Sequence, residues 1–367
     1  MLQPKVNILD YSPAHLADYL ESIGEKSTQS GLLIKGIFKS QVTSLSEIPG
    51  VNSSLSGKLA EYAGLGTLDP LEEQISDDGL TRKILFQLED GKTIESTLMF
   101  FRNSSTGRER RTVCVSSQVG CSIGCRYCAT GRQGFERNLR PNEILNQILY
   151  FLRWLGDTDG DNGKGWLSNV VFMGMGEPLA NYENVSHAIA MLNDQRGLGL
   201  GSHQLTLSTS GLVPQIRRLA GEKLQVQLAV SLHAANNDMR DYLVPINKKY
   251  PLAELMDACH EYADKTGRKI FIEYALFEGV NDSVLGATDL IALLDNLDCT
   301  INLIPGNLTS PENFKPTSVE QAMKFQRQLI SGGFRTMLRM ARGTDIQAGC
   351  GQLRSRRLDG DRVAAEE

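Results

Sequence analysis

Short apolar runs alternate with amphipathic segments from residue 112 onward. Seven runs rich in β-branched and aliphatic residues have the length of strands, and the segments between them repeat apolar residues at helical spacing. The segment from Asn142 to Leu155 is typical, with Pro141 suited to a first helical turn. This alternation predicts an α/β fold of parallel βα units, whose ligands bind at the carboxyl ends of the strands. The predicted strands are residues 112–116, 169–173, 204–208, 226–232, 270–276, 300–304 and 335–340.

The first third of the chain has a different pattern. Residues 1–80 alternate short helical segments with turns, and Ile48-Pro49-Gly50-Val51 is typical of a hairpin between two short helices. That hairpin resembles helix–hairpin–helix modules, which bind nucleic-acid backbone, but an ordinary helical accessory domain fits equally well. Two β-rich runs around Asp90-Gly91 predict a β-hairpin over residues 83–101. The predicted units are a helical accessory domain (1–80), a hairpin and linker (81–111), a core (112–345), and a C-terminal loop with a polar tail (346–367).

Composition narrows the class of protein. With 367 residues, 41% of them hydrophobic, the chain can form one large domain with a smaller appendage. The first residues do not form a secretion signal and no apolar run reaches membrane-spanning length, so we expect a cytoplasmic protein. The net charge of -5 does not by itself indicate a nucleic-acid partner. Arginines nevertheless cluster in three places, as solvated surface or as a phosphate-binding track. They are Arg102, Arg108, Arg110 and Arg111; Arg132, Arg137 and Arg140; and Arg354, Arg356 and Arg357.

Cys121, Cys125 and Cys128 form a CxxxCxxC motif. Seven cysteines in a chain without a secretion signal argue against a disulfide scaffold and favour metal or redox chemistry. Three thiolates at this spacing can bind three irons of a [4Fe-4S] cubane, which leaves the fourth iron open to the amino and carboxylate groups of S-adenosylmethionine (SAM). Structural zinc needs a further ligand pair, and the sequence has no second CxxC and no closely spaced His pair. A zinc-stabilised RNA-binding protein without catalytic activity is the alternative from another class.

Further motifs resemble the radical SAM superfamily, which implies a partial (β/α)6 TIM-like barrel as the core. The segment VVFMGMGEPLANYENV resembles that superfamily's Gly-Glu-Pro element, in which Gly176 and Glu177 would bind the SAM amino group. TLSTSG, AVSLHA and NLIPGN then match, in order, the dual-specificity 23S rRNA and tRNA adenine-C2 methyltransferases and their C8-methylating relatives. Tyr127 would pack either against the adenine of SAM or simply in the core. By this resemblance the other SAM-binding residues are Ser208, Ser231, Leu232, His233 and Asn307.

The resemblance also assigns roles to two more cysteines. Adenine C2 and C8 are electron-poor carbons that cannot attack a methyl sulfonium directly, so a radical route is needed. As the resemblance implies, Cys350 takes a methyl group from one SAM, and the 5′-deoxyadenosyl radical of a second SAM removes hydrogen from that methyl. The carbon radical adds to the ring, a base removes the ring proton, and Cys114 attacks Cys350 to form a disulfide and release methylated RNA. Turnover then needs an external electron donor such as flavodoxin.

Glu95 is the candidate for the base. The family places a glutamate shortly before the resolving cysteine, and Ile94-Glu95-Ser96-Thr97 is the matching context. Residues 101–111 make this connection longer than usual, so Glu95 is either the proton acceptor or an exposed hairpin carboxylate. Cys259 and Cys299 fit buried core positions.

The resulting expectation is a monomeric enzyme that uses two SAM molecules per turnover to methylate adenine C2. Its substrates would be 23S rRNA at the peptidyl-transferase centre and tRNA next to the anticodon. The nearest rival methylates adenine C8 of 23S rRNA and confers antibiotic resistance. The extended N-terminal region and the stretch Arg132–Leu139 favour the C2 branch.

Overall fold

A single large sheet organises the protein. The computed structural model describes residues 5–102, 107, 109–159, 164–306, 314–339, 345–346 and 352–355. Within them, a ten-stranded sheet has the order β14-β13-β12-β11-β10-β9-β6-β5-β4-β3. The strands from β14 to β6 pair in parallel, and all seven predicted strands are confirmed. They are β6 (Glu109–Cys114), β9 (Asn169–Phe172), β10 (Leu205–Thr209), β11 (Gln227–Ser231), β12 (Ile270–Leu276), β13 (Cys299–Pro305) and β14 (Arg335–Leu338).

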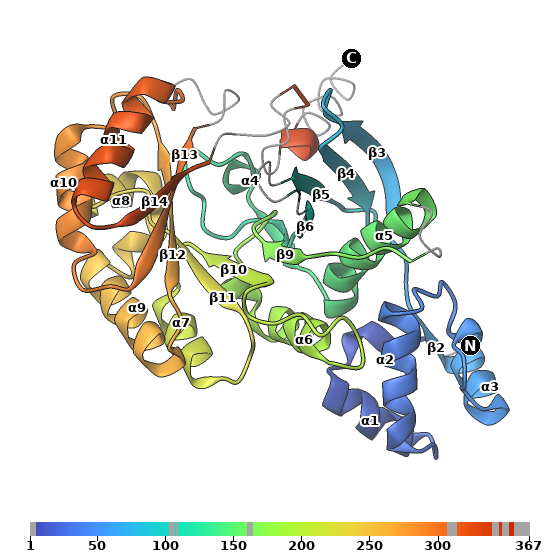
Figure 1. Cartoon of the computed structure of the whole chain (residues 1–367). Coiled ribbons are helices and arrows are strands. Elements are labelled where there is room, and N and C mark those ends of the chain that lie inside the picture. Colours follow the sequence, from blue (N-terminus) through green and yellow to red (C-terminus); the bar gives the residue numbers. More distant parts are fainter. Residues whose placement is uncertain are drawn as a thin grey trace.

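Helices connect successive parallel strands and cover the outer side of the sheet (Figure 1). Strands such as β11 and β13 are buried nearly throughout and rich in apolar residues, because the sheet is covered on both faces. The α/β fold with six βα units is therefore confirmed. The connecting helices are α5 (Pro141–Asp159), α6 (Tyr182–Asn193), α7 (Val213–Gly221), α8 (Asn237–Leu243), α9 (Leu252–Thr266), α10 (Val284–Leu293) and α11 (Val319–Ser331).

Three antiparallel strands extend the sheet beyond β6. The predicted hairpin is confirmed as β4 (Thr81–Gln87) and β5 (Thr93–Arg102), and β5 pairs antiparallel with β6. The hairpin is thus continuous with the core sheet. A further strand, β3 (Asp69–Ile75), pairs with β4, so the expectation that residues 1–80 are helical is wrong at this point. Its sequence, DPLEEQI, is acidic and largely exposed, which hid the strand from a search for apolar runs.

The helical N-terminal region packs against α5 and α6 at one end of the molecule (Figure 1). The Asn142 side chain donates a 2.7 Å hydrogen bond to Asp10, and Arg153 donates a 2.7 Å bond to the carbonyl of Val42. The turn Ile48–Val51 lies between a 3-10 helix and α3, as the sequence predicts. The helices of this region are α1 (Pro13–Ser22), α2 (Ser30–Phe38) and α3 (Ser53–Tyr62), with a short parallel pair of β1 (Val6–Asn7) and β2 (Ala63–Gly64).

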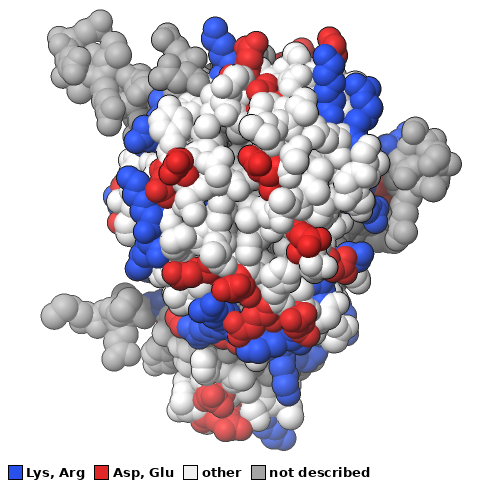
Figure 2. Space-filling model, turned by 90° about the vertical axis from the view of Figure 1, so that its left-hand side faces the viewer, with Lys and Arg blue, Asp and Glu red and all other residues white. Residues whose placement is uncertain are grey.

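The surface is mixed in charge on the face that Figure 2 shows. Basic and acidic side chains are interspersed there, with wide areas that carry neither. This face offers no continuous basic field of the kind that binds a nucleic-acid backbone. In the described part of the chain, each helix is too short or too polar to cross a bilayer.

Candidate active site

The cysteine motif lies in a tight loop between two short strands. β7 (Gln118–Gly120) pairs antiparallel with β8 (Phe135–Asn138), and α4 (Ala129–Arg132) lies between them. Gly120 has a φ of +76°, and a Cβ there would come within 1.9 Å of the Gly134 carbonyl oxygen. Only glycine therefore fits immediately before Cys121. The Cys121 amide donates a 2.8 Å hydrogen bond to the same carbonyl, which fixes the start of the loop.

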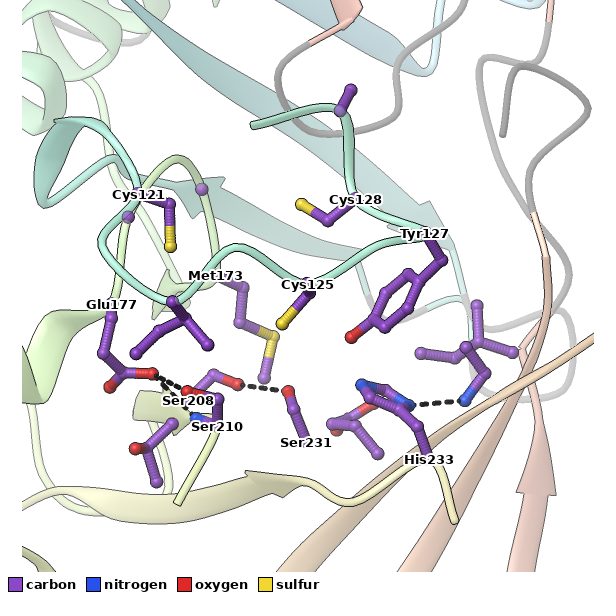
Figure 3. A pocket seen from close by; sticks show the side chains of 18 of the residues that line it. Cys121, Cys125, Tyr127, Cys128, Met173, Glu177, Ser208, Ser210, Ser231 and His233 are labelled. Carbon is purple, nitrogen blue, oxygen red and sulfur yellow. Dashed lines mark hydrogen bonds between the residues drawn. The ribbon is translucent and has the colours of Figure 1, made fainter. Parts of the chain in front are cut away.

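Cys121, Cys125 and Cys128 all line one pocket of about 320 Å³ at the carboxyl ends of the parallel strands (Figure 3). All three are free thiols. Burial raises the pKa of each, to about 12 for Cys121, and the neighbouring charge of Cys128 raises that of Cys121 further. Thiols that lie this close together in a buried site ionise together only if a cation is bound, and metal coordination deprotonates a thiol. The three side chains therefore fit a cationic iron–sulfur cluster.

A single metal ion does not fit the same residues equally well. In the described ranges, no three His, Cys, Asp or Glu side chains lie close enough together to hold one ion. Cubane ligands each bind a different iron, so their sulfur atoms need not converge on one point. Three cysteines supply the protein ligands of such a cluster, whereas structural zinc takes four.

The opposite wall of the pocket consists of polar side chains from neighbouring strands. Ser208 at the end of β10 and Ser231 at the end of β11 bring their hydroxyl oxygens within 3.3 Å of each other. Glu177 follows β9, and its buried carboxylate accepts hydrogen bonds from the Ser210 amide (2.7 Å) and hydroxyl (2.6 Å). Burial raises the pKa of Glu177, and the two Ser210 donors oppose that shift. Polar groups from three strands thus face the thiols, as the parallel-sheet rule predicts.

His233 lines the pocket in a strained backbone conformation, with φ +59°. Its Nδ1 accepts a 2.9 Å hydrogen bond from the Ala275 amide, so Nε2 carries the proton. Burial, and secondly the charge of Arg240, lowers the pKa of His233 to about 3, so the ring is neutral. The Tyr127 ring packs edge-on against it, with the centroids 5.0 Å apart, and also lines the pocket. Tyr127 therefore has both predicted surroundings: it packs on other rings and borders the cavity.

Arg240 lies fully buried behind this wall and ties two strand ends together. Its guanidinium donates to the carbonyls of Ser210 (2.6 Å) and Leu232 (3.2 Å) and to the Asn247 side chain (3.0 Å). Burying a charge costs roughly several kcal/mol unless hydrogen bonds satisfy it. The hydrogen bonds of the Arg240 guanidinium do so. Arg240 thereby fixes the main chain next to the residues that border the pocket.

Five of the seven predicted SAM-binding residues line this pocket. Gly176, Glu177, Ser208, Ser231 and His233 do so. The side chain of Leu232 instead packs in the hydrophobic core, because neighbouring residues of an extended chain point to opposite faces. The Leu232 side chain therefore does not face a ligand bound in this pocket. Asn307 lies outside the described residues.

A second pocket, of about 630 Å³, shares Met173 and Gly174 with the first. It contains Cys114, at the end of β6, and Glu95, on β5, and we call it the Cys114 pocket. Its lining is otherwise mostly apolar, with two arginines. The lining residues are Thr81, Glu95, Ser96, Thr97, Met99, Phe101, Arg110, Cys114, Met173, Gly174, Met337, Leu338 and Arg339.

Glu95 is buried, with 3% of its surface exposed, so its interpretation as an exposed hairpin carboxylate is wrong. Its Oε2 lies 2.6 Å from the Lys83 ammonium, and its Oε1 accepts a 2.6 Å hydrogen bond from the Arg354 amide. Glu95 pairs with Leu85 on β4, and residues 101, 102, 109 and 110 of the longer connection pair with one another farther along β5 and β6. Its role as a proton acceptor stays a prediction.

Cys114 is half-buried and also free. Burial raises its pKa to about 12, while the Lys83 charge lowers it. Ser96 and Ser116 hold the surrounding strands: the Ser96 hydroxyl donates to the Cys114 carbonyl at 2.7 Å, and the Ser116 hydroxyl donates to the Glu95 carbonyl at 2.6 Å. The cysteine and the carboxylate are therefore held on adjacent strands of one pocket. Cys350 lies outside the described residues.

The C-terminal turn, residues 352–355, packs against both pockets. Gln352 lines the first pocket. The buried Arg354 side chain donates to Thr93 (3.1 Å) and Gln133 (2.7 Å) and pairs with Glu136. This turn therefore joins the β4–β5 hairpin to the end of the cysteine loop (Figure 1).

Comparisons with known proteins agree with this geometry. The sequence model of the radical SAM superfamily matches residues 115–291. A probable dual-specificity RNA methyltransferase RlmN of Dictyoglomus thermophilum is 41% identical over 349 residues, or 95% of this chain and 97% of that protein. The chain belongs to the RlmN family. The dual-specificity RNA methyltransferase RlmN of Marinomonas sp. is 42% identical over 95% of this chain and 93% of its own length. A crystal structure of a radical SAM methyltransferase from Sphaerobacter thermophilus has a TM-score of 0.85 at 40% identity, covering 95% of this chain and 98% of that one.

Membership in the RlmN family and the radical SAM superfamily implies a [4Fe-4S] cluster and SAM as cofactors, and RNA as the substrate. In this RlmN-family chain, Cys121, Cys125 and Cys128 are the residues that would hold the cluster. The pocket they share with Glu177, Ser208 and Ser231 is where SAM would bind.

Several polar residues in or beside the two pockets escaped the sequence patterns. Glu273 lines the first pocket, with its carboxylate 2.7 Å from the Asn302 amide nitrogen. Its signal was a single carboxylate in the apolar strand IFIEYAL. The sequence pattern did not single out Lys83 or Arg240. Charged residues are common on the exposed faces of hairpins and short helices, so the burial of these two could not be recognised.

Three arginines of the predicted basic clusters make contacts within the protein. Arg137 pairs with Asp90 and Glu143, and Arg354 is buried. Arg111 stacks on Trp166, with its guanidinium carbon 4.3 Å from the ring centroid. These three arginines therefore stabilise the protein and do not form a phosphate track.

Proposed function

We propose that this chain methylates C2 of adenine in 23S rRNA, at the peptidyl-transferase centre, and in tRNA next to the anticodon. The names of its relatives, dual-specificity RNA methyltransferases, support this function. The observation that carries it is the pair of adjoining pockets. One contains the three thiols of a cluster site, and the other contains Cys114 and Glu95.

In this proposal each turnover uses two SAM molecules. Cys350 takes the methyl group of the first, leaving S-adenosylhomocysteine. The cluster, when bound, supplies the electron that cleaves the second SAM and so yields the radical that takes hydrogen from this methyl group. The pocket residues hold SAM beside the thiols: Glu177 fixes the loop after β9, and Ser208 and Ser231 present hydroxyls from β10 and β11.

The Cys114 pocket would bind the target adenine. Its apolar walls, with Phe101 and Met173, suit a base taken out of its stack. Addition of the Cys350 methylene radical to the ring carbon leaves one unpaired electron, which the adduct would return to the oxidised cluster, and the Glu95 carboxylate accepts the proton of that carbon. The Cys114 thiolate then attacks the Cys350 sulfur. The sulfur–carbon bond breaks, its electron pair and a solvent proton complete the methyl group, and a disulfide forms.

The remaining parts of the proposal concern partners. Two electrons from an external donor such as flavodoxin would reduce the Cys114–Cys350 disulfide after each turnover. The helical N-terminal region is the proposed accessory RNA-binding part, and the protein would act as a monomer in the cytoplasm.

Nucleoside analysis tests the proposed function. Anaerobically reconstituted protein is incubated with SAM, reductant and either a 23S rRNA fragment or tRNA, and the digested RNA is analysed by mass spectrometry. We expect 2-methyladenosine from both RNAs. 8-Methyladenosine from rRNA alone would instead identify the resistance-type activity, and unmodified adenosine in both would contradict the proposal.

A further inference from the structure

Lys83 is a buried lysine that the reaction described above does not use. It lies on β4 with 1% of its surface exposed. Lysine is almost never fully buried without a partner, because its ammonium loses its hydration. Here Nζ lies 2.6 Å from Oε2 of Glu95, the candidate base.

Strand register places this pair next to Cys114. Lys83 pairs with Thr97 on β5, and Thr97 pairs with Cys114 on β6. The three residues therefore form a row across three strands. Glu95, two residues before Thr97, lies on the same face and diagonally opposite Lys83. Glu95, Thr97 and Cys114 all line the Cys114 pocket.

We propose that Lys83 is a positioning residue that keeps Glu95 anionic and directs its carboxylate into the Cys114 pocket. This inference rests on the proposed function, because it concerns the proton that Glu95 accepts from the ring carbon. An anionic carboxylate is the form that can accept this proton. A buried carboxylate without a cation beside it would tend to be neutral.

Other titratable and charged groups also lie around Glu95. Cys114 faces it from β6 and contributes a thiol, which is neutral at physiological pH because burial raises its pKa to about 12. The C-terminal turn contributes the Arg354 amide, and the guanidinium of that residue points to Thr93, Gln133 and Glu136. Arg110 and Arg339 line the same pocket. Lys83 contacts the carboxylate directly, with Nζ 2.6 Å from Oε2, which is ion-pair distance.

A purely structural role explains this pair less well. A buried ion pair seldom stabilises a fold more than apolar side chains of similar volume would. The Lys83 ammonium holds one oxygen of the Glu95 carboxylate, and the Arg354 amide holds the other. These two contacts fix the orientation of the carboxylate in the pocket.

The test compares single and double variants of the full-length, reconstituted enzyme across a range of pH. Lys83→Met removes the charge with little change in length, Lys83→Arg keeps it, and Glu95→Gln removes the base. Lys265→Met is the matched control, because Lys265 forms an exposed ion pair with Glu261 on α9. The readouts are 2-methyladenosine by mass spectrometry and the covalent protein–RNA species on denaturing gels.

For Lys83→Met we expect the covalent protein–RNA species to accumulate at neutral pH and to resolve as the pH is raised. The acidic limb of the pH–rate profile should move upward by about one to three pH units, the usual effect of an opposite charge at this distance. Lys83→Arg and Lys265→Met should keep the wild-type profile. On the Glu95→Gln background, where removal of the ring proton limits the rate, Lys83→Met should not slow product formation further, although it also removes the charge that lowers the pKa of Cys114.

Two results would overturn the inference. One is a Lys83→Met enzyme that loses product by the same factor at every pH without accumulating the covalent species. The other is a double variant clearly slower than Glu95→Gln alone. If Lys83→Met does not fold, the double variant, which removes both charges together, and Lys83→Arg decide the question. Failure of the proposed function would look different, because wild-type protein would then form neither 2-methyladenosine nor the covalent species.

Discussion

Replacing Cys125 by alanine is expected to abolish methylation of RNA while leaving the protein folded. The Cys125 side chain points into the first pocket together with those of Cys121 and Cys128 (Figure 3). With one thiolate missing, the cluster would have only two protein ligands. The loss to folding should be small, about 1 kcal/mol, because the residue packs in a small satellite cluster at the pocket edge. Iron and sulfide content, RNA methylation and thermal unfolding are the measurements.

Cys259→Ala is the matched control for this variant. Cys259 is also buried, on α9, but it lies in the main core and borders neither pocket. We expect a normal iron content and normal activity, with a modest loss of stability. Normal RNA methylation by the Cys125→Ala protein would contradict the assignment of the cluster ligands.

Replacing Cys114 by alanine is expected to stop turnover and to trap the RNA on the protein. The Cys114 thiol lies in the second pocket together with Glu95. Its proposed role is to attack the Cys350 sulfur and so break the methylene bridge between Cys350 and the RNA. Without this thiol the bridge has no nucleophile to cleave it, so the covalent species should persist. Because burial raises the pKa of Cys114 to about 12, release by the wild-type enzyme should become faster as the pH rises toward that value. The covalent species is measured on denaturing gels.

Cys299→Ala is a suitable control for the trapping experiment, because Cys299 is a buried cysteine at the start of β13 outside both pockets. It should methylate RNA and leave no trapped species. If Cys114→Ala released methylated RNA at the wild-type rate, Cys114 would not be the resolving thiol. A Cys350→Ala variant should form no covalent species at all.

The parallel strands could be predicted because their environment makes their sequence distinctive. A strand buried on both faces has a run of apolar residues, as in Leu228–Val230 of β11, and the helices between the strands carry a clear 3.6-residue period. β3 could not be predicted in this way, because an exposed edge strand such as DPLEEQI needs no apolar side chains.

Part of the candidate site could be predicted from the rule that ligands bind at the carboxyl ends of parallel strands. The ends of parallel strands meet at one edge, so Ser208 and Ser231 could be expected beside the loop after β9. Leu232 shows the limit of that rule, because its side chain points into the core. The Lys83–Glu95 pair depends on the register between β4 and β5. Turn geometry sets that register, so the sequence pattern alone did not predict the pair.

Electron paramagnetic resonance tests most directly whether Cys121, Cys125 and Cys128 hold a [4Fe-4S] cluster that binds SAM. The sample is the reduced, anaerobically reconstituted wild-type protein, with and without SAM. We expect the signal of one reduced [4Fe-4S] cluster per chain. This signal should change when SAM binds the iron that has no protein ligand. A protein that holds one zinc and no iron, or a cluster whose signal is indifferent to SAM, would contradict this expectation.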